Sequence, residues 1–233
     1  MATRMKTIGL VGGMSWESSA VYYRDLNLGV SERLGGLASP KLVMSTVDFA
    51  ELTELEDAER WDQIGTLLAD AGRSVERGGA DFLLLCTTTF HKVADQVAAA
   101  VGIPLLHLAD VVADACRDAG VGKVAFIGTQ VAMSDGFFID RMAGHGLGVL
   151  VPPASEHDWL NTAIYEELVH GHVLDRTRRR VVDLIHRLWD AGAEGVLLGC
   201  TELELLIHQA DVDLPVFPCT TLHVEAALDL ALS

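Results

Sequence analysis

The sequence has few positive charges: 17 Lys and Arg stand against 33 Asp and Glu among its 233 residues, giving a formal net charge of −16. Such an acidic chain argues against binding to nucleic acid or to an anionic membrane surface, where clustered cations supply the affinity. It does not argue against a small-molecule substrate, because a few charged groups in a binding site can outweigh the net charge of the chain. Only four lysines are present and none has an evident Schiff-base setting, which argues against pyridoxal phosphate chemistry.

Long hydrophobic runs are also lacking. No uninterrupted apolar run approaches the roughly 18 residues that span a bilayer, and the basic N-terminal stretch meets Gly12-Gly13 before a signal-type segment is complete. The four cysteines show no CxxC or metal-ligand spacing. We therefore expect a cytoplasmic protein with reduced thiols, without a metal and without a membrane partner.

A nucleotide-binding loop is missing as well. The turn Gly12-Gly13-Met14-Ser15 follows an apolar strand, but it lacks the GK[ST] ending of a P-loop and the third glycine of a dinucleotide loop. Ser15 instead predicts the cap of a helix that opens at about Trp16, with Glu17 in its first turn.

Two short apolar runs, residues 82–85 and 195–198, are bounded by small residues, as expected of buried parallel strands. When the two runs are superimposed, Asp81 falls on Glu194 and the leucines coincide. The residue that then matches Cys200 is Thr87, 113 positions earlier, while Cys86 lies one place too early.

Other correspondences have similar spacings: Gly12 matches Gly128, 116 positions apart, and Pro104 matches Pro215, 111 positions apart. We interpret this as an internal duplication giving an α/β fold of two pseudo-symmetric domains, each a parallel sheet flanked by helices. The domains are expected at 1–108 plus about 219–233, and at 109–218. Length alone would also allow one large domain.

The expected elements follow the same repeat. In the first half we predict strands at 7–11, 41–47, 82–85 and 104–108, and helices at 16–33, 52–77 and 91–101. In the second half we predict strands at 124–127, 148–151, 195–198 and 214–217, and helices at 159–171, 176–191 and from about 223.

Ligands of such sheets bind at the carboxyl ends of the strands, where free backbone N–H groups can hold a carboxylate. The turns at these ends supply the candidate site residues: Gly13, Met14, Thr87, Thr88, Thr89, Thr129, Cys200, Thr201 and Glu202. A helix start should lower the pKa of the Cys200 thiol and make thiolate accessible near neutrality. The alternative is that Cys200 is only a small, buried, apolar side chain. For Cys86 we adopt that interpretation.

The sequence resembles the aspartate/glutamate racemase family. The resemblance covers almost the whole chain in order and is carried by these motifs: IGLVGGMSWESSAVYYRDLN, STVDF, CTTTFHKVAD, IGTQVAMSDGFF, YEELVHG, LLGCTELELL and TLHVEAAL. It implies two pseudo-symmetric α/β domains with the active site in the cleft between them. It also implies cofactor-independent racemisation, with one residue of each half on either side of the substrate α-carbon. Position by position, the catalytic pair is Cys200 and Thr87, where most members have two Cys.

Two departures from the family pattern bear on the substrate. Thr88 replaces the family's Asn, which helps to hold the substrate carboxylate. Where aspartate-preferring members have basic residues, the corresponding stretches offer Asp48 and Trp159 and no Lys or Arg. An acidic side chain would therefore lack a counter-charge, which favours a broad or non-acidic substrate preference.

The resulting hypothesis is an isomerase without cofactor or metal that interconverts L- and D-amino acids, with Cys200 as the stronger base. Gly13, Met14, Thr88, Thr89, Thr129, Thr201 and Glu202 are its expected substrate-binding residues, and Asp48 and Trp159 its side-chain pocket. Family members are commonly dimers, so a homodimer is expected. Two alternatives stay open: a one-Cys isomerase or decarboxylase on the same fold, and a catalytically silent small-molecule binding protein.

Overall fold

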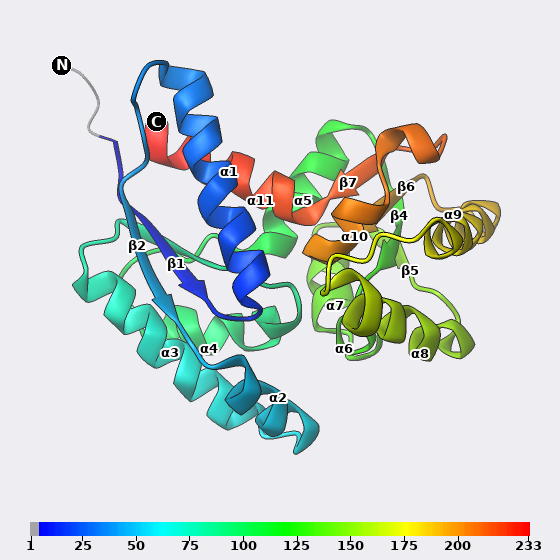
Figure 1. Cartoon of the computed structure of the whole chain (residues 1–233), viewed down its shortest axis with the longest axis horizontal. Helices are drawn as coiled ribbons and strands as arrows, with labels where there is room; N and C mark the ends of the chain where they lie inside the picture. The colour runs from blue at the N-terminus through cyan, green and yellow to red at the C-terminus, as the bar shows by residue number, and fades with distance from the viewer. Residues whose placement is uncertain (1–4) are drawn as a thin grey trace. The chain divides into compact units, whose positions relative to one another are not determined.

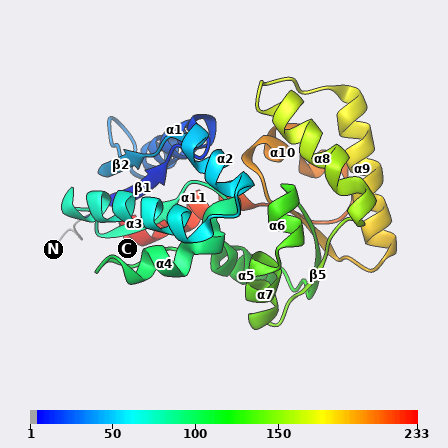
Figure 2. The ribbon, with the colours of Figure 1, turned by 90° about the horizontal axis from the view of Figure 1, so that it is seen from below.

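The computed structural model of the protein describes residues 5–233. The chain divides into two compact units, one formed by the residues up to Leu108 together with His223–Ser233, the other by Ala109–Leu222. Figures 1 and 2 show the elements of each unit in two perpendicular views. No helix in the described part of the chain is both long and apolar enough to cross a membrane.

The sheet of the first unit contains three parallel strands in the order β2 (Leu42–Thr46), β1 (Ile8–Gly12) and β3 (Phe82–Leu85). Beyond β3 an isolated parallel bridge joins Leu83 to Leu105. The chain crosses over between strands through helices, as a parallel sheet requires.

Helices cover both faces of this sheet (Figure 1). One face packs against α1 (Trp16–Leu34) and the later part of α11 (Cys219–Leu232), and the other against α3 (Trp61–Arg77) and α4 (Ala94–Ala99). The side chains divide by strict alternation, as a pleated strand demands: Ile8, Leu10, Phe82 and Leu84 face α1 and α11, whereas Val11, Leu83 and Leu85 face α3 and α4. The shorter elements of the unit are α2 (Phe49–Asp57) and the 3₁₀ helix η1 (Thr89–Val93).

The sheet of the second unit has four parallel strands, in the order β5 (Gly148–Leu150), β4 (Lys123–Ile127), β6 (Gly195–Leu198) and β7 (Val216–Pro218). Its other elements are α5 (Leu108–Asp118), α6 (Gln130–Ser134), α7 (Phe137–Gly144), α8 (Ala154–Thr162), the π-helical η2 (Ala163–Leu168), α9 (Asp175–Asp190), α10 (Thr201–Leu206) and the 3₁₀ helix η3 (Gln209–Asp211).

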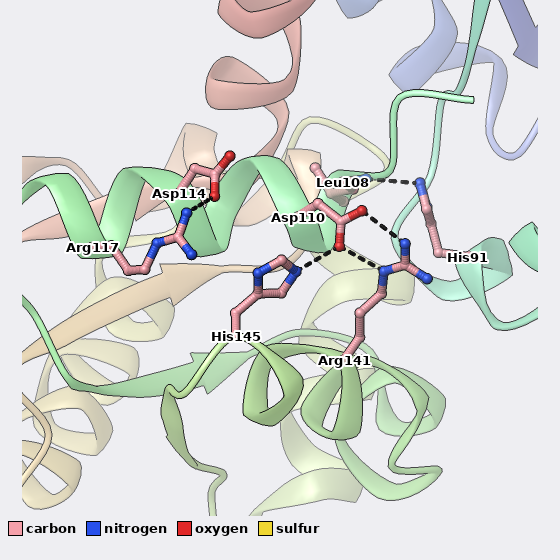
Figure 3. Close-up of polar contacts among 7 residues, drawn as sticks. All are labelled: His91, Leu108, Asp110, Asp114, Arg117, Arg141 and His145. Atoms are coloured by element: carbon pink, nitrogen blue, oxygen red, sulfur yellow. Dashed lines mark hydrogen bonds and ion pairs between the residues drawn. The ribbon is translucent and has the colours of Figure 1, made fainter. Parts of the chain in front are cut away.

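Asp110 of α5 holds helix α7 (Figure 3). Its carboxylate accepts two hydrogen bonds from the guanidinium of Arg141, each 2.7 Å long, and lies 2.8 Å from Nε2 of His145. A bidentate guanidinium–carboxylate pair fixes direction as well as distance. The neighbouring pair Asp114 and Arg117, on the same helix, is more exposed and joins no second element.

The internal duplication is visible in the hydrogen bonds. The Asp81 carboxylate accepts from Thr7 N at 2.6 Å while Asp81 N donates to Thr7 O at 2.8 Å. In the second unit, the Glu194 carboxylate accepts from Lys123 N at 3.1 Å while Glu194 N donates to Lys123 O at 2.7 Å. The residues that superimpose in the sequence therefore make the same contact, each beside the first strand of its own sheet. The expected architecture of two parallel sheets flanked by helices is confirmed.

Several elements differ from expectation. The helix expected over residues 52–77 is two helices, α2 and α3, because the chain turns at Glu59, whose φ is 55°. The strand expected at 104–108 makes only the bridge at Leu105, since Pro104 has no N–H to donate and α5 already begins at Leu108. The helix expected over 159–171 begins earlier, as α8 at Ala154, and continues as the π-helical η2 only to Leu168.

The final helix begins at Cys219, earlier than residue 223, where the sequence led us to expect it. The boundary between the units falls inside this helix, so that its first turn, residues 219–222, lies in the second unit. Contacts made by that first turn, described below, account for this division.

Candidate active site

The carboxyl ends of three neighbouring strands bring together the candidate residues of the first unit. In the parallel register Gly12 pairs with Thr46, and Val11 pairs with Leu85. The turns that follow these strands carry Gly13-Met14, Asp48 and residues 87–89. All of the first-unit candidates therefore lie along one edge of one sheet.

The Gly13 turn is held by serine hydroxyls. Gly13 N donates to Ser19 Oγ at 2.8 Å, and Ser19 Oγ donates to Ser15 O at 2.8 Å. Ser15 caps α1 by accepting from Ser18 N. Gly13 has a φ of 93°, and a Cβ there would overlap the backbone of Val47 at the end of β2, so only glycine fits. The neighbouring Met14 is buried and its side chain packs in the core.

Asp48 lies at the exposed end of β2. Its Oδ1 accepts from Ala50 N at 3.0 Å, which makes it the N-cap of α2. The structure thus gives the Asp48 carboxylate a local role in capping a helix, a role that any Asp preceding a helix can take.

Thr87, Thr88 and Thr89 follow β3, with Thr87 and Thr88 partly exposed and Thr89 buried. The carbonyl oxygen of Thr87 lies 2.7 Å from Nδ1 of the buried His91. The other ring nitrogen, Nε2, accepts from Leu108 N at 3.2 Å (Figure 3). Because a carbonyl only accepts and a backbone N–H only donates, His91 is neutral with its proton on Nδ1.

Cys86, one residue before Thr87, is fully buried among the side chains that face α1 and α11. Burial raises the pKa of its thiol far above the ordinary value. Cys86 N donates to Val11 O at 2.9 Å within the sheet. Its environment is that of a structural cysteine.

In the second unit the ends of β4 and β6 lie side by side, with Ile127 paired to Leu198 and Gly199 N donating to Ile127 O at 2.8 Å. Thr129 follows β4 and Cys200 follows β6, so the structure brings these two candidates to one edge. A Cβ at Gly199 would overlap the ring of Phe126, which is stacked on Phe138 with centroids 4.6 Å apart. The Phe126 ring therefore leaves no room for a side chain at the residue that precedes Cys200.

Cys200 is the N-cap residue of α10, and its Sγ donates to Glu202 Oε2 at 2.6 Å. Burial raises the pKa of the Cys200 thiol well above its ordinary value, and the Glu202 charge raises it further. Backbone N–H groups of Glu202 and Leu203 act in the opposite direction but do not prevail. The expectation of a lowered pKa is therefore wrong, because α10 is only six residues long and the thiol, although Cys200 is partly exposed, is largely removed from water beside a carboxylate. At rest Cys200 is a thiol.

The remaining second-unit candidates contact residues that the sequence did not single out. Thr129 Oγ1 caps α6 by accepting from Ala132 N at 3.3 Å, and Gln130 N donates to Asn161 Oδ1 at 3.1 Å. Thr201 Oγ1 lies 3.4 Å from Thr220 Oγ1. Asn161 and Thr220 have no local sequence signal, since each is recognised only through the partner that folding brings to it.

Trp159 is placed differently. Its ring stacks under the guanidinium of Arg180 of α9, 3.9 Å from the ring centroid. On a helix, positions two apart differ by about 200°, so Trp159 lies on nearly the opposite side of α8 from Asn161, the residue that reaches the Thr129 turn. Within residues 5–233 no group of three or more His, Cys, Asp and Glu side chains is arranged to hold a metal ion.

The model of the Asp/Glu/Hydantoin racemase family matches residues 11–227 of the chain. A candidate Asp/Glu racemase from Yersinia pestis is 40% identical, with a TM-score of 0.93 over 98% of this chain and 100% of its own. An aspartate racemase homologue from Pyrococcus horikoshii is 34% identical, with a TM-score of 0.87 over 98% of this chain and 100% of its own.

More distant structures share the fold. The aspartate racemase of Picrophilus torridus is 16% identical, with a TM-score of 0.75 over 97% of this chain and 94% of its own. Arylmalonate decarboxylase is further away, at 17% identity and a TM-score of 0.58.

Proposed function

Because the chain belongs to the Asp/Glu/hydantoin racemase family, we propose that it is a cofactor-independent racemase that interconverts the L and D forms of an amino acid. The reaction removes the proton from the α-carbon and returns one to the opposite face. The observation that supports it most directly is the Cys200 thiol, at a strand end and 2.6 Å from the Glu202 carboxylate.

Cys200 and Glu202 form the first proton-transfer pair. When the thiol passes its proton to Glu202, the thiolate can take the α-proton, and the pair then holds both protons. In the other direction the resting Cys200 thiol gives its proton to the carbanion, which leaves a thiolate beside the ionised Glu202; the sulfur then regains a proton from solvent, to which Cys200 is partly exposed. The high pKa of the resting thiol suits the second role, and the buried carboxylate of Glu202 is what makes the first accessible.

We assign the second proton position to Thr87, the residue that the internal repeat pairs with Cys200. A hydroxyl is a poor base at neutral pH and needs support from its neighbours. His91 supports Thr87 through the backbone, since its Nδ1 contacts the Thr87 carbonyl oxygen rather than the hydroxyl. Turnover should therefore depend on direction more than in an enzyme with two equivalent thiols.

The substrate carboxylate is assigned to hydroxyl and backbone N–H groups of residues 87–89, Thr129 and Thr201. Their donors would also stabilise the negative charge that develops as the α-carbon loses its proton. Gly13 contributes less than the sequence suggested, because its N–H already donates to Ser19 Oγ.

We propose a substrate with a neutral side chain. Asp48 places a carboxylate at the same sheet edge as Thr87, and a second carboxylate brought close to it would be repelled. The cation nearest to the other expected pocket residue, Trp159, is Arg180, which also pairs with Glu156 at 3.2 Å. We further propose a homodimer in the cytoplasm; the four free cysteines are compatible with a reducing compartment.

The test is exchange of the α-proton in D₂O, followed by NMR, for a panel of L- and D-amino acids at neutral pH. We expect deuterium at the α-carbon together with inversion, abolished by Cys200→Ala and retained in Cys86→Ser. Absence of exchange with every amino acid would refute racemisation. Release of CO₂ from aryl- or alkylmalonates would instead indicate a one-Cys decarboxylase, and a thermal shift with an amino acid but without exchange would indicate a silent binding protein.

A further inference from the structure

The first turn of helix α11 is capped by a side chain from another helix. Pro218 precedes the helix and offers no side-chain acceptor for the first N–H groups. These groups bind Glu204 of α10: Thr220 N donates to Oε1 at 2.6 Å, and Thr221 N donates to Oε2 at 3.3 Å. The Thr221 hydroxyl adds a bond to Oε2 at 2.9 Å. Both carboxylate oxygens are thus used.

The same two helices meet again at the candidate site. Thr201, directly after Cys200, lies with Oγ1 3.4 Å from Oγ1 of Thr220. Helix α10 is only six residues long, too short to be stable by itself, so tertiary contacts set its position. Leu203 and Leu206 give it apolar burial, which is not directional. The Glu204 bonds are directional, and they lie less than one helical turn from Thr201.

Placing the charge of Glu204 in this partly buried position costs free energy. That a carboxylate nevertheless stands here indicates that its two acceptor oxygens are needed. Burial raises the pKa of this carboxyl to about 7, while its hydrogen bonds to Thr220 and Thr221 lower it. The titratable group that interacts with it from α11 is the buried Cys219 thiol, and on α10 the nearest acid is Glu202, bonded to Cys200. A neutral side chain would avoid the cost of burial but would lose one of the two acceptors.

We propose that Glu204 is a positioning residue of the Cys200 half of the site: its carboxylate fixes α10 on the first turn of α11 and so sets the orientation of the Cys200 thiol and the Thr201 hydroxyl. This inference rests on the proposed racemase function. In the ionised state Glu204 accepts from both N–H groups. A protonated carboxyl, or an amide, turns one acceptor into a donor that faces an N–H group.

The test uses Glu204→Gln with Glu194→Gln as its matched control. Glu194 also accepts from two backbone N–H groups, those of Gly122 at 2.6 Å and Lys123 at 3.1 Å, but it lies before β6 while Cys200 follows it. For α-proton exchange measured between pH 5.5 and 9, we expect Glu204→Gln to lower kcat by about tenfold or more. The rise of the wild-type rate near pH 7 should flatten, and Glu194→Gln should stay within about twofold of wild type.

A second readout does not depend on turnover. Cys200 is partly exposed whereas Cys86, Cys116 and Cys219 are buried, so iodoacetamide followed by mass spectrometry reports selectively on Cys200 in the folded protein. The rate of Cys200 alkylation should change by about threefold or more in Glu204→Gln and not in Glu194→Gln. If the wild type exchanges no α-proton, the proposed function fails, and alkylation still decides the role of Glu204.

Two outcomes would overturn the proposal. One is that Glu204→Gln exchanges the α-proton, and is alkylated at Cys200, at the same rates as the wild type. The other is that Glu204→Gln and Glu194→Gln change these rates by the same factor. Should Glu204→Gln not fold, as judged by circular dichroism, Thr221→Val takes its place. That variant removes only the 2.9 Å bond and keeps the charge. It should slow exchange by about two- to fivefold while preserving the pH dependence, because the carboxylate still titrates. Unchanged exchange in Thr221→Val would also contradict the proposal.

Discussion

Nδ1 of His91 lies 2.7 Å from the carbonyl oxygen of Thr87, so that a buried, neutral imidazole holds the backbone of the residue assigned to the second proton position. The ring supports the backbone while the Thr87 hydroxyl keeps its own hydrogen-bonding capacity. This arrangement leads to the first prediction.

His91→Ala should slow α-proton exchange by about tenfold or more, because even a small displacement of a reacting group lowers the reaction rate strongly. The matched control is His157→Ala in the second unit. His157 is also a buried ring with a bond to a backbone carbonyl, that of Pro152, at 2.8 Å. Both variants should lose about 1–3 kcal/mol of unfolding free energy, measured in urea. Equal effects on exchange would show that His91 acts only through stability.

Gly199→Ala should disturb Cys200 through the core. A Cβ there would overlap the Phe126 ring, which cannot retreat because it is stacked on Phe138. We expect a loss of about 1–3 kcal/mol in unfolding free energy together with slower Cys200 alkylation. Gly144→Ala is the control, since nothing lies within 4 Å of a Cβ at that position. It should be neutral or slightly stabilising, and equal losses in the two variants would contradict the steric argument.

Asp110→Asn should cost more than Asp114→Asn. Asp110 loses a bidentate bond to Arg141 and a contact with His145 that together join α5 to α7 (Figure 3). Because the Asp110 side chain is 36% exposed, solvent screening limits the loss to about 1–2 kcal/mol. Asp114 pairs with Arg117 on its own exposed helix face, for which about 0.5 kcal/mol or less is expected. Chemical denaturation of both variants at low and high salt measures the difference.

The buried His223 and the partly buried Glu204 should make stability depend on pH in opposite directions. Burial lowers the pKa of His223 to about 4, from 6.5. Between these values the unfolded chain binds a proton that the folded chain does not. This contribution, at most about 3 kcal/mol, is present above pH 6.5 and lost as the pH falls toward 4. Tyr22 donates to Nδ1 of His223 while Nε2 donates to Leu106 O, so the neutral ring is the one that fits.

Glu204 acts the other way, because its folded pKa of about 7 lies above the ordinary 4.5. Its contribution is present below pH 4.5 and lost as the pH rises through 7, again by at most about 3 kcal/mol. The unfolding free energy of Glu204→Gln relative to wild type should therefore increase with pH across this window. A pH-independent difference between the two proteins would show that Glu204 does not titrate there.

Much of the fold follows from local patterns. The buried strands β3 and β6 appear in the sequence as short apolar runs between small residues, and Ser15 marks the start of α1. Helix α5 was not among the predicted elements, although Ala109, Val112, Ala113 and Cys116 are buried at helical spacing, a pattern that a search for amphipathic segments could find.

The site was less accessible from sequence. Superimposing the halves pairs Cys200 with Thr87, but the protonation state of Cys200 depends on how deeply the thiol is buried and on where the Glu202 carboxylate points. Neither the burial of the thiol nor the direction of the carboxylate can be predicted from the neighbouring residues in the sequence. The bond between Glu204 and the first turn of α11 likewise joins residues 16 positions apart, through a contact that only the folded chain creates.

The division of helix α11 between the two units also affects the order in which parts of the chain can fold during synthesis. The face of the first sheet that carries Ile8 and Leu10 is covered by Val224, Ala227, Leu228 and Ala231. During synthesis these residues emerge from the ribosome only after the whole of the second unit. The half of the chain that is translated first therefore keeps one face of its sheet incompletely covered until these last residues emerge, and a chaperone that protects an exposed apolar sheet would act on the N-terminal half.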